Sequence, residues 1–287
     1  MMGFFYMNKL GRIFGKSFEG FLFGNWFISL SAVLLTLSSI KSLSLDMAGL
    51  VPVLALTGFG VLLVYSIHAI FTRSADAQSV RKRWINEYSG LLWANIIGSG
   101  IILLACIPFL KKETFFFLIP CALISVGYSA RIRIGLKSWS LREVPYGKAF
   151  LVAGVWSLVS VLLPLFQAQQ SFSVKAFVLI VIRFLLLWLL CFLFDIRDLK
   201  EDNNKGTRTL LMAAGIRNLR LLAYGGLFFI CLLSYLIAET TLMVLMLFGF
   251  AGVWFITSAS EHRGDYFYSL WGDGLILLYA VVALFSN

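Results

Sequence analysis

The sequence predicts an all-α integral membrane protein with about nine transmembrane helices and a cytoplasmic N-terminus. Three observations lead to this fold class. The 287 residues are 60% hydrophobic and only 13% charged, their mean hydropathy is +0.89, and the apolar residues form long stretches separated by short polar loops. A water-soluble domain of this size has no interior large enough to bury so much apolar surface.

Each predicted span is an apolar stretch close to the roughly 20 residues that a helix needs to cross about 30 Å of hydrocarbon. In chain order the spans are Phe21–Ile40, Ala48–Phe71, Leu91–Leu110, Phe115–Ala130, Ala149–Phe166, Phe177–Phe194, Leu221–Ala238, Leu242–Ser258 and Leu270–Phe285. The fourth is short and contains Pro120, although a proline kink is tolerated inside a bundle. No low-complexity linker divides the chain, so we expect one membrane domain over residues 1–287, with two halves near 1–145 and 146–287.

The lysine and arginine residues predict the orientation. One side of the predicted topology holds Lys9, Arg12, Lys16, Arg73, Arg81, Lys82, Arg83, Arg131, Arg133, Lys137, Arg142, Lys148, Arg197, Lys200, Lys205, Arg208, Arg217, Arg220 and Arg263. The other side holds only Lys41, Lys111, Lys112 and Lys175. Because cytoplasmic loops are rich in these residues, we expect a multi-pass protein of a bacterial cytoplasmic membrane. The net charge of +10 then reflects orientation, and no nucleic-acid partner is expected.

An acidic stretch directly after the sixth span is the strongest candidate for a functional site. Asp195, Asp198 and Asp202 are separated by three and then four residues, which places their carboxylates on one face of a helix. We expect the intervening Arg197 to point elsewhere. Carboxylates on one face repel each other unless a cation lies among them, and Mg²⁺ takes oxygen ligands of this kind. The alternative is a solvated loop that happens to be charged.

The residues from Asp195 to Leu210 also carry a resemblance to a known family. The run D-I-R-D-L-K-E-D-N-N-K-G-T-R-T-L resembles the second aspartate-rich motif of the UbiA-type membrane prenyltransferase superfamily. In that motif an Asp-x-x-Asp-x-x-x-Asp helix end leads into a basic turn. Lys205 and Arg208 stand in this turn and supply positive charge suited to phosphate.

The first aspartate-rich motif of the superfamily is degraded in this sequence. Active members place Asn-Asp-x-x-Asp-x-x-x-Asp at the end of the second span, whereas the corresponding stretch here, Tyr65–Asp76, keeps a single acid, Asp76, with His68 at helical spacing. Two interpretations are open. Either His68 and Asp76 help to hold a diphosphate or its metal, or His68 is a hydrogen-bonded histidine at a helix end and the first metal position is lost.

Other basic residues are further candidates for contact with phosphate. The stretch Gly127–Lys137 resembles the superfamily's tyrosine-then-basic turn, and R-E-V-P-Y-G-K, which ends at Lys148, resembles the entry to the fifth span in related membrane proteins. Arg131 and Lys148 are therefore candidates, and both also fit lipid-facing anchors. Arg183 lies inside the sixth apolar span, where a bare charge costs several kcal/mol. We therefore expect it to face the bundle interior or a wet cavity, and we favour a role in lining the cavity.

The resemblance implies a prenyltransferase that transfers a polyprenyl group from its diphosphate to an aromatic or other lipophilic acceptor at the cytoplasmic face, assisted by Mg²⁺. On this hypothesis the catalytic residues are Asp195, Asp198 and Asp202, the metal ligands are these three and Asp76, and the substrate-binding residues are His68, Asp76, Arg131, Lys148, Arg183, Lys205 and Arg208. The expected partners are the polyprenyl diphosphate, its acceptor and membrane lipid. The rival hypothesis is an inactive transporter or lipid-binding protein of the same fold, which the degraded first motif favours.

Overall fold

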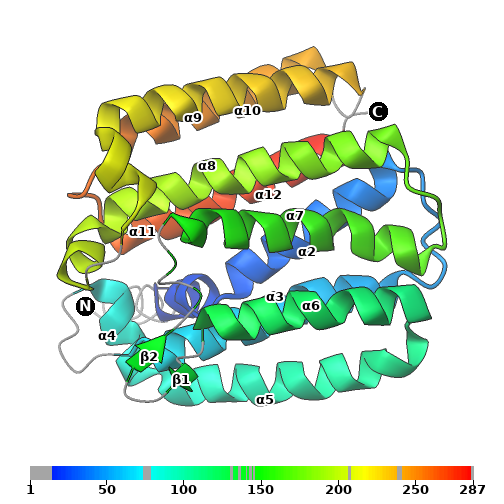
Figure 1. Ribbon diagram of the computed structural model, residues 1–287, viewed down its shortest axis with the longest axis horizontal. Helices are drawn as coiled ribbons and strands as arrows, with labels where there is room; N and C mark the ends of the chain where they lie inside the picture. Colours follow the sequence, from blue (N-terminus) through cyan, green and yellow to red (C-terminus); the bar gives the residue numbers. More distant parts are fainter. Residues whose placement is uncertain are drawn as a thin grey trace, which may run out of the picture.

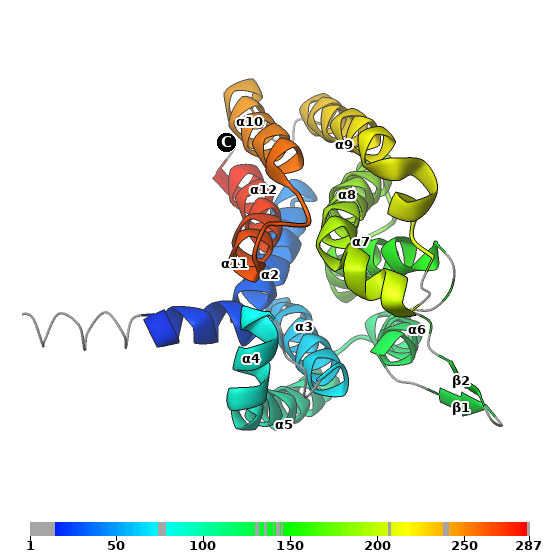
Figure 2. The same cartoon turned by 90° about the vertical axis from the view of Figure 1, so that its left-hand side faces the viewer.

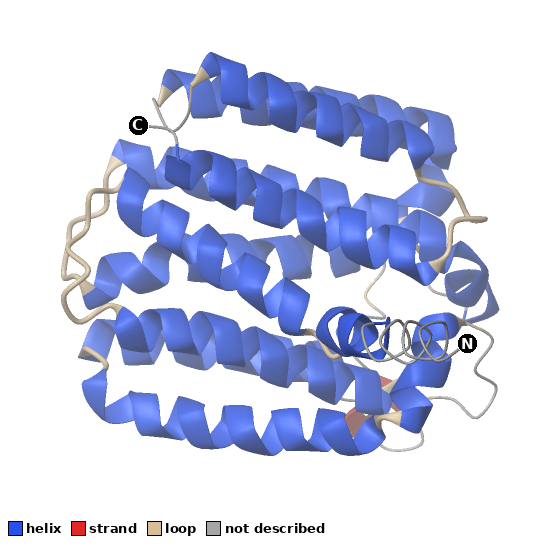
Figure 3. Ribbon diagram, turned by 180° about the vertical axis from the view of Figure 1, so that it is seen from behind, coloured by secondary structure: helices blue, strands red, loops and turns tan. Residues whose placement is uncertain are grey.

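Long helices make up nearly all of the computed structural model (Figure 1, and from behind in Figure 3), which describes residues 15–73, 79–129, 132–134, 137–139, 141, 144, 146–205, 208–237 and 241–285. After a first helix, Gly15–Phe23, the helices are α2 (Trp26–Ser42), α3 (Val51–Phe71), α4 (Val80–Glu87), α5 (Ser89–Cys106), α6 (Lys112–Ser129), α7 (Gly147–Gln167), α8 (Val174–Lys205), α9 (Leu210–Leu236), α10 (Leu242–Ser258), α11 (Asp265–Phe267) and α12 (Asp273–Phe285). A 3₁₀ turn, Ile107–Phe109, follows α5, and a π turn, Tyr268–Gly272, precedes α12. The strands β1 (Ile132–Ile134) and β2 (Lys137–Trp139) form one short antiparallel hairpin.

A helix occupies each of the nine predicted spans, but the predicted number of membrane crossings is not confirmed. Six helices of the described chain are long and apolar enough to cross a membrane. A seventh crossing requires the helix Gly15–Phe23 and α2 to act as one span bent by 55°. Helix α10, with 17 residues, falls among the shorter apolar helices, and α6 is not among the six. Several apolar crossings are enough to make this an integral, multi-pass membrane protein.

The bend before α2 has a local cause in Asn25. This residue has a φ of 67°, in the left-handed region, which asparagine tolerates better than most residues. Its side-chain amide donates a hydrogen bond to Ser66 on α3, and its carbonyl oxygen accepts one from the hydroxyl of Ser29. The break between the helix Gly15–Phe23 and α2 is therefore stabilised by one hydrogen bond to α3 and one within the start of α2.

The helices form two adjoining groups, seen nearly end-on in Figure 2. Helices α2, α3, α6 and α7 pack around a common centre, with α5 outside α3. Helices α8, α9, α10 and α12 form the second group, which contacts the first where α8 packs on α7 and α12 packs on α2. Helices from both predicted halves of the chain are thus in direct contact, and a division near residue 145 stays a prediction.

Helix α8 is the centre of the largest apolar core. Leu186, Leu190 and Leu193 on this helix are buried, as are Ala153 on α7 and Leu227 on α9. Lipid tails are as apolar as these side chains, so close packing rather than exclusion of water holds such helices together. Small residues such as Ala153 let the helices approach closely. This packing fixes α8, and with it the acidic stretch near its C-terminal end.

The backbone at Gly272, just before α12, lies close to the ring of Phe194 on α8, and a substitution can test this contact. A Cβ atom added there would lie 2.6 Å from Cζ of Phe194 on α8, so the ring must move. We expect Gly272→Ala to lower the melting temperature in detergent, followed by tryptophan fluorescence, at a cost of about 1–3 kcal/mol for overpacking. At Gly274 the same addition meets only Phe27 at 3.7 Å, so Gly274→Ala is the matched control. Equal melting temperatures for the two variants would contradict the prediction.

Candidate functional site

A cavity of about 590 Å³ lies among the helices of the first group and reaches α8 and α12. Its apolar part includes Leu56, Leu103 and Leu118, which lie near the start of α3, the end of α5 and the start of α6. Its charged lining residues are Arg81, Lys148, Arg197, Asp198 and Asp273, and they lie near the start of α4, the start of α7, the C-terminal part of α8 and the start of α12. The cavity is therefore charged at one end of the bundle and apolar towards the other.

The three aspartates of α8 converge on a single lysine. Nζ of Lys148 lies 2.7 Å from Oδ1 of Asp195, 3.2 Å from Oδ2 of Asp202 and 3.9 Å from Oδ2 of Asp198. The predicted common face is therefore present, because α8 continues as a helix to Lys205. Asp195 and Asp202 are 3% and 1% exposed and do not line the cavity, whereas Lys148 does. The ammonium group stands between these two carboxylates and the cavity.

The position of Lys148 follows from how α7 begins. The backbone N–H of Tyr146 donates a 3.1 Å hydrogen bond to the carbonyl oxygen of Arg208, which ties the start of α7 to the segment after α8. Lys148 is the second residue of α7 and so lies beside the C-terminal turns of α8. Small, buried Ala149 follows it and allows the two helices to approach closely.

Arg197 also faces the cavity, so the prediction that it points elsewhere is wrong. Its Nε donates a 2.8 Å hydrogen bond to Oδ1 of Asp198, and its Nη2 donates one of 3.3 Å to Oδ2. The guanidinium lies 4.8 Å from the ring centroid of Phe194 and 5.8 Å from that of Tyr268. The reason is the reach of the side chain, which turns towards the neighbouring carboxylate and the aromatic faces.

Arg81, on the short helix α4, completes the charged end. The backbone N–H of Arg81 donates a 2.8 Å hydrogen bond to the carboxylate of Asp265, which fixes the start of α4 beside α11. Burial lowers the pKa of the Arg81 guanidinium from its ordinary value, Arg197 acts in the same direction, and Asp273 and Asp265 oppose them. Arg81, Arg197 and Asp273 are thus close enough to interact electrostatically.

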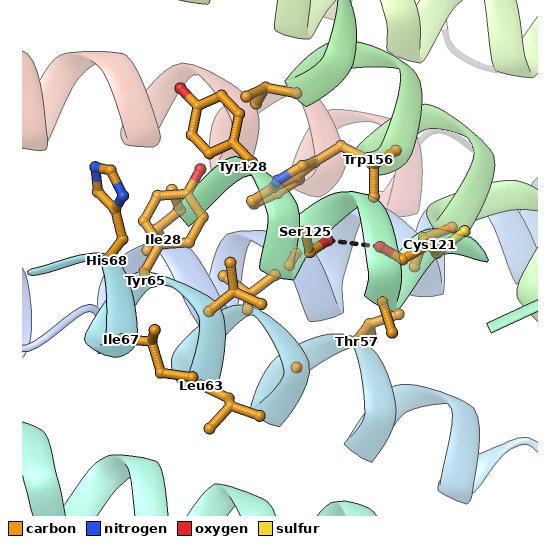
Figure 4. A pocket seen from close by; sticks show the side chains of 18 of the residues that line it. Ile28, Thr57, Leu63, Tyr65, Ile67, His68, Cys121, Ser125, Tyr128 and Trp156 are labelled. Carbon is orange, nitrogen blue, oxygen red and sulfur yellow. Dashed lines mark hydrogen bonds between the residues drawn. The ribbon is translucent and has the colours of Figure 1, made fainter. Parts of the chain in front are cut away.

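Aromatic side chains from α3, α6 and α7 form part of the cavity wall (Figure 4). Tyr65 on α3 meets Trp156 on α7 edge to face, with ring centroids 6.2 Å apart. His68, one turn further along α3, lies with its ring 6.0 Å from that of Tyr128 on α6. All four line the cavity. Their electron-rich faces suit a cation or an aromatic ring.

The structure brings some of the predicted substrate-binding residues to the cavity and leaves others away from it. His68 and Lys148 line it. Arg208 is exposed and does not line it. The side chain of Lys205 is not among those described, and Asp76 and Arg131 lie outside the described residues. The catalytic and metal-binding roles of Asp195, Asp198 and Asp202 stay predictions.

Arg183 does not line the cavity, contrary to the expectation from its place in the sixth span. It is fully buried, donates a 2.9 Å hydrogen bond from Nη2 to Ser38 on α2, and lies 4.7 Å from the ring centroid of Tyr279 on α12. Twelve residues of helix separate it from Asp195, which is about 18 Å along the axis. It therefore joins α8 to α2 and α12.

Sequence reasoning missed two cavity residues, Arg197 and Asp273. We predicted that Arg197 points elsewhere, and Asp273 was not among the predicted site residues. The signal available for Arg197 was its direct sequence neighbour Asp198, a carboxylate within reach of its side chain. For Asp273 the tertiary approach of α12 to α2, where the hydroxyl of Ser31 donates to the carbonyl oxygen of Asp273 at 3.2 Å, decides the position.

Comparison with known proteins supports the resemblance noted in the acidic stretch. The model of the UbiA prenyltransferase family matches residues 85–265, more than half of the chain. This protein belongs to the UbiA prenyltransferase family. No sequence match was found among curated proteins.

Solved structures share the fold over nearly the full chain. A UbiA homologue from Aeropyrum pernix K1 aligns with a TM-score of 0.65 and 11% identity, covering 90% of this chain and 97% of its own. A UbiA homologue from Archaeoglobus fulgidus, bound to GPP and Mg²⁺, aligns with a TM-score of 0.61 and 11% identity, covering 93% and 98%. A digeranylgeranylglyceryl phosphate synthase aligns with a TM-score of 0.54 and 14% identity, covering 90% and 93%. At such identities the likeness shows a UbiA fold.

The shared ammonium group generates a stability prediction. Removing one partner of a buried ion pair leaves the other charge uncompensated, which costs about 3–5 kcal/mol. We therefore expect Lys148→Met to lower the melting temperature clearly, and Asp195→Asn in the Lys148→Met background to recover part of the loss, because one of the stranded charges is then removed. Lys112→Met, at an exposed lysine, is the control. Additive effects of the two substitutions would show that the groups are not coupled.

Proposed function

We propose that this protein transfers a polyprenyl group from its diphosphate to a lipophilic acceptor, such as an aromatic ring, at the cytoplasmic face of a bacterial membrane. The observation that carries the proposal is a continuous cavity with cationic residues at one end and apolar side chains towards the other. A prenyl diphosphate has the same division between head and tail. The GPP bound to the Archaeoglobus homologue supports this class of donor substrate.

The proposed chemistry follows from the cationic residues and the aromatic residues that line the cavity. The allylic C–O bond breaks, and its electron pair leaves with the diphosphate, whose growing negative charge Lys148, Arg197 and Arg81 stabilise. The faces of Tyr65 and Trp156 stabilise the allylic cation. The cation bonds to a nucleophilic atom of the acceptor, which gives up a proton to the imidazole of His68 or to water.

Magnesium is bound in solved relatives with GPP or DMAPP and stays a prediction for this chain. The residues described here do not fit it in their present arrangement. Asp195 and Asp202 are bound to Lys148, Asp198 is bound to Arg197, and the described residues contain no group of three or more His, Cys, Asp or Glu side chains able to hold a metal. One buried oxygen, Oδ1 of Asp202, lacks a hydrogen-bond partner among them, but Mg²⁺ requires six ligands. No step above depends on the metal.

The proposal that the charged end of the cavity faces the cytoplasm rests on the distribution of charge. Arg81, Lys148 and Arg197 gather at the end of the bundle where α3 and α8 end and α7 begins. Lys111 and Lys112 lie at the start of α6, on the side that the topology assigns to the exterior. The positive-inside rule supports a cytoplasmic position for the charged end.

The rival function, a transporter or lipid-binding protein with no chemistry, is favoured by one observation. Tyr65 and His68 line the cavity in the stretch where active members carry carboxylates. Turnover separates the two hypotheses, since both allow a lipid diphosphate to bind.

The experiment that tests the proposed function follows geranylgeranyl diphosphate incubated with the purified protein and a lipophilic extract, with Mg²⁺ present. We expect diphosphate release coupled to a prenylated product detected by mass spectrometry. Asp198→Asn removes the partner that orients Arg197, so turnover should fall on the order of a hundredfold. Glu87→Gln, at an exposed carboxylate, is the control. Binding without product in the wild type would favour the rival.

The apolar part of the cavity predicts how chain length is selected. Gly60 lines the cavity, and nothing lies within 4 Å of a Cβ atom added there. Gly60→Phe should fill part of the apolar space and weaken binding of geranylgeranyl diphosphate more than that of dimethylallyl diphosphate, by about tenfold for the few methylenes excluded. Gly100→Phe, which is equally open but away from the cavity, is the control. Equal losses for both diphosphates would contradict a tail lying along α3.

A further inference from the structure

The charge that faces the cavity differs from what a metal-binding aspartate cluster would present. Among the described lining residues there are three cations, Arg81, Lys148 and Arg197, and two carboxylates, Asp198 and Asp273. Both oxygens of Asp198 accept hydrogen bonds from Arg197. The described side chains that border the cavity at this end thus include one more cation than carboxylates, and the cations are placed to contact an anion directly.

The two other motif carboxylates are out of reach from the cavity. Asp195 and Asp202 are buried behind Lys148, whose ammonium group binds an oxygen of each. A magnesium ion placed among the three aspartates would have to occupy the position of Nζ, because oxygen ligands lie about 2.0–2.1 Å from this ion. Both cations cannot be held there together, since like charges a few ångströms apart repel strongly in a buried site.

We propose that Lys148 takes the place of a divalent metal ion in this chain, so that the diphosphate group binds directly to Lys148, Arg197 and Arg81 without Mg²⁺. This inference rests on the proposed function, because it concerns how the same donor substrate is held. Lys148 uses two of its three ammonium protons on Asp195 and Asp202, which leaves one for a phosphate oxygen. The guanidinium of Arg197 keeps donors beyond the two that Asp198 receives.

The degraded first motif fits this assignment. A site that attaches diphosphate through several metal ions needs carboxylates on both sides of the head group. On the α3 side the described residues supply Tyr65 and His68 instead, which bring no negative charge to neutralise. With Asp195 and Asp202 held by Lys148 on one side, and with Tyr65 and His68 as the described polar residues on the other, the cations of the chain are left to hold the diphosphate.

The test measures the affinity for geranylgeranyl diphosphate by calorimetry on the purified, detergent-solubilised protein, once with Mg²⁺ and once with EDTA. We expect the wild-type dissociation constants to agree within about threefold. Lys148→Met should weaken binding in EDTA by about tenfold or more, the usual effect of losing a hydrogen bond to a charged group. Added Mg²⁺ should recover part of that loss, because the substitution frees the carboxylates of Asp195 and Asp202 for a metal.

Controls keep the result interpretable. Lys112→Met, at an exposed lysine away from the cavity, should bind as the wild type does. Because Lys148→Met strands buried carboxylates and is prone to unfold, Arg81→Met serves as the second variant, and it should also lose about tenfold in EDTA.

The outcomes separate the two proposals. Wild-type binding that requires Mg²⁺, or unchanged affinity of both Lys148→Met and Arg81→Met in EDTA, would overturn the direct diphosphate site and leave the prenyltransferase proposal standing. An absence of binding by folded wild-type protein in both conditions would count against the prenyl diphosphate substrate itself.

Discussion

The contact of one ammonium group with three carboxylates is the interaction on which the site depends. Lys148 comes from the start of α7, and Asp195, Asp198 and Asp202 come from the C-terminal part of α8. An unpaired carboxylate buried at the edge of a membrane is very unfavourable, and three on one helix face would repel each other. The lysine removes both problems and, at the same time, fixes the position of α7 against α8. The geometry of the cavity therefore follows from the compensation of charge.

The same interaction decides which charges the cavity displays. Because Lys148 covers Asp195 and Asp202, the cavity beside this acidic motif is bordered, among the described residues, by three cations and two carboxylates. Arg197 repeats the arrangement on a smaller scale, since it binds Asp198 and lies across the faces of Phe194 and Tyr268. A motif rich in aspartate is thus not by itself a negatively charged site. Its sign depends on the partners that tertiary packing brings to it.

This dependence on tertiary contacts explains how much of the site could be predicted from the sequence. Apolar length located the helices, and the spacing of Asp195, Asp198 and Asp202 placed them on one face, because both properties are local to a segment. Lys148 was a candidate for phosphate, but nothing near it in the sequence showed that it would meet residues about fifty positions later. Arg183 showed the same limit. Its burial was predictable from its place in an apolar span, whereas its partners Ser38 and Tyr279 belong to helices from both ends of the chain.

Arg183 on α8, which is fully buried, and Lys148 on α7, which is partly buried, differ in what their charges can do. Arg183 is enclosed by α2 and α12, where it contacts a hydroxyl and an aromatic face, and it does not line the cavity described above. Lys148 is held as firmly, but its ammonium group borders an open space of about 590 Å³. A charged group that is paired on one side and borders a cavity on the other can bind a ligand in the cavity while it keeps its hydrogen bonds to its partners. Lys148 meets this condition and Arg183 does not, which is why we propose anion binding at the junction of α7 and α8.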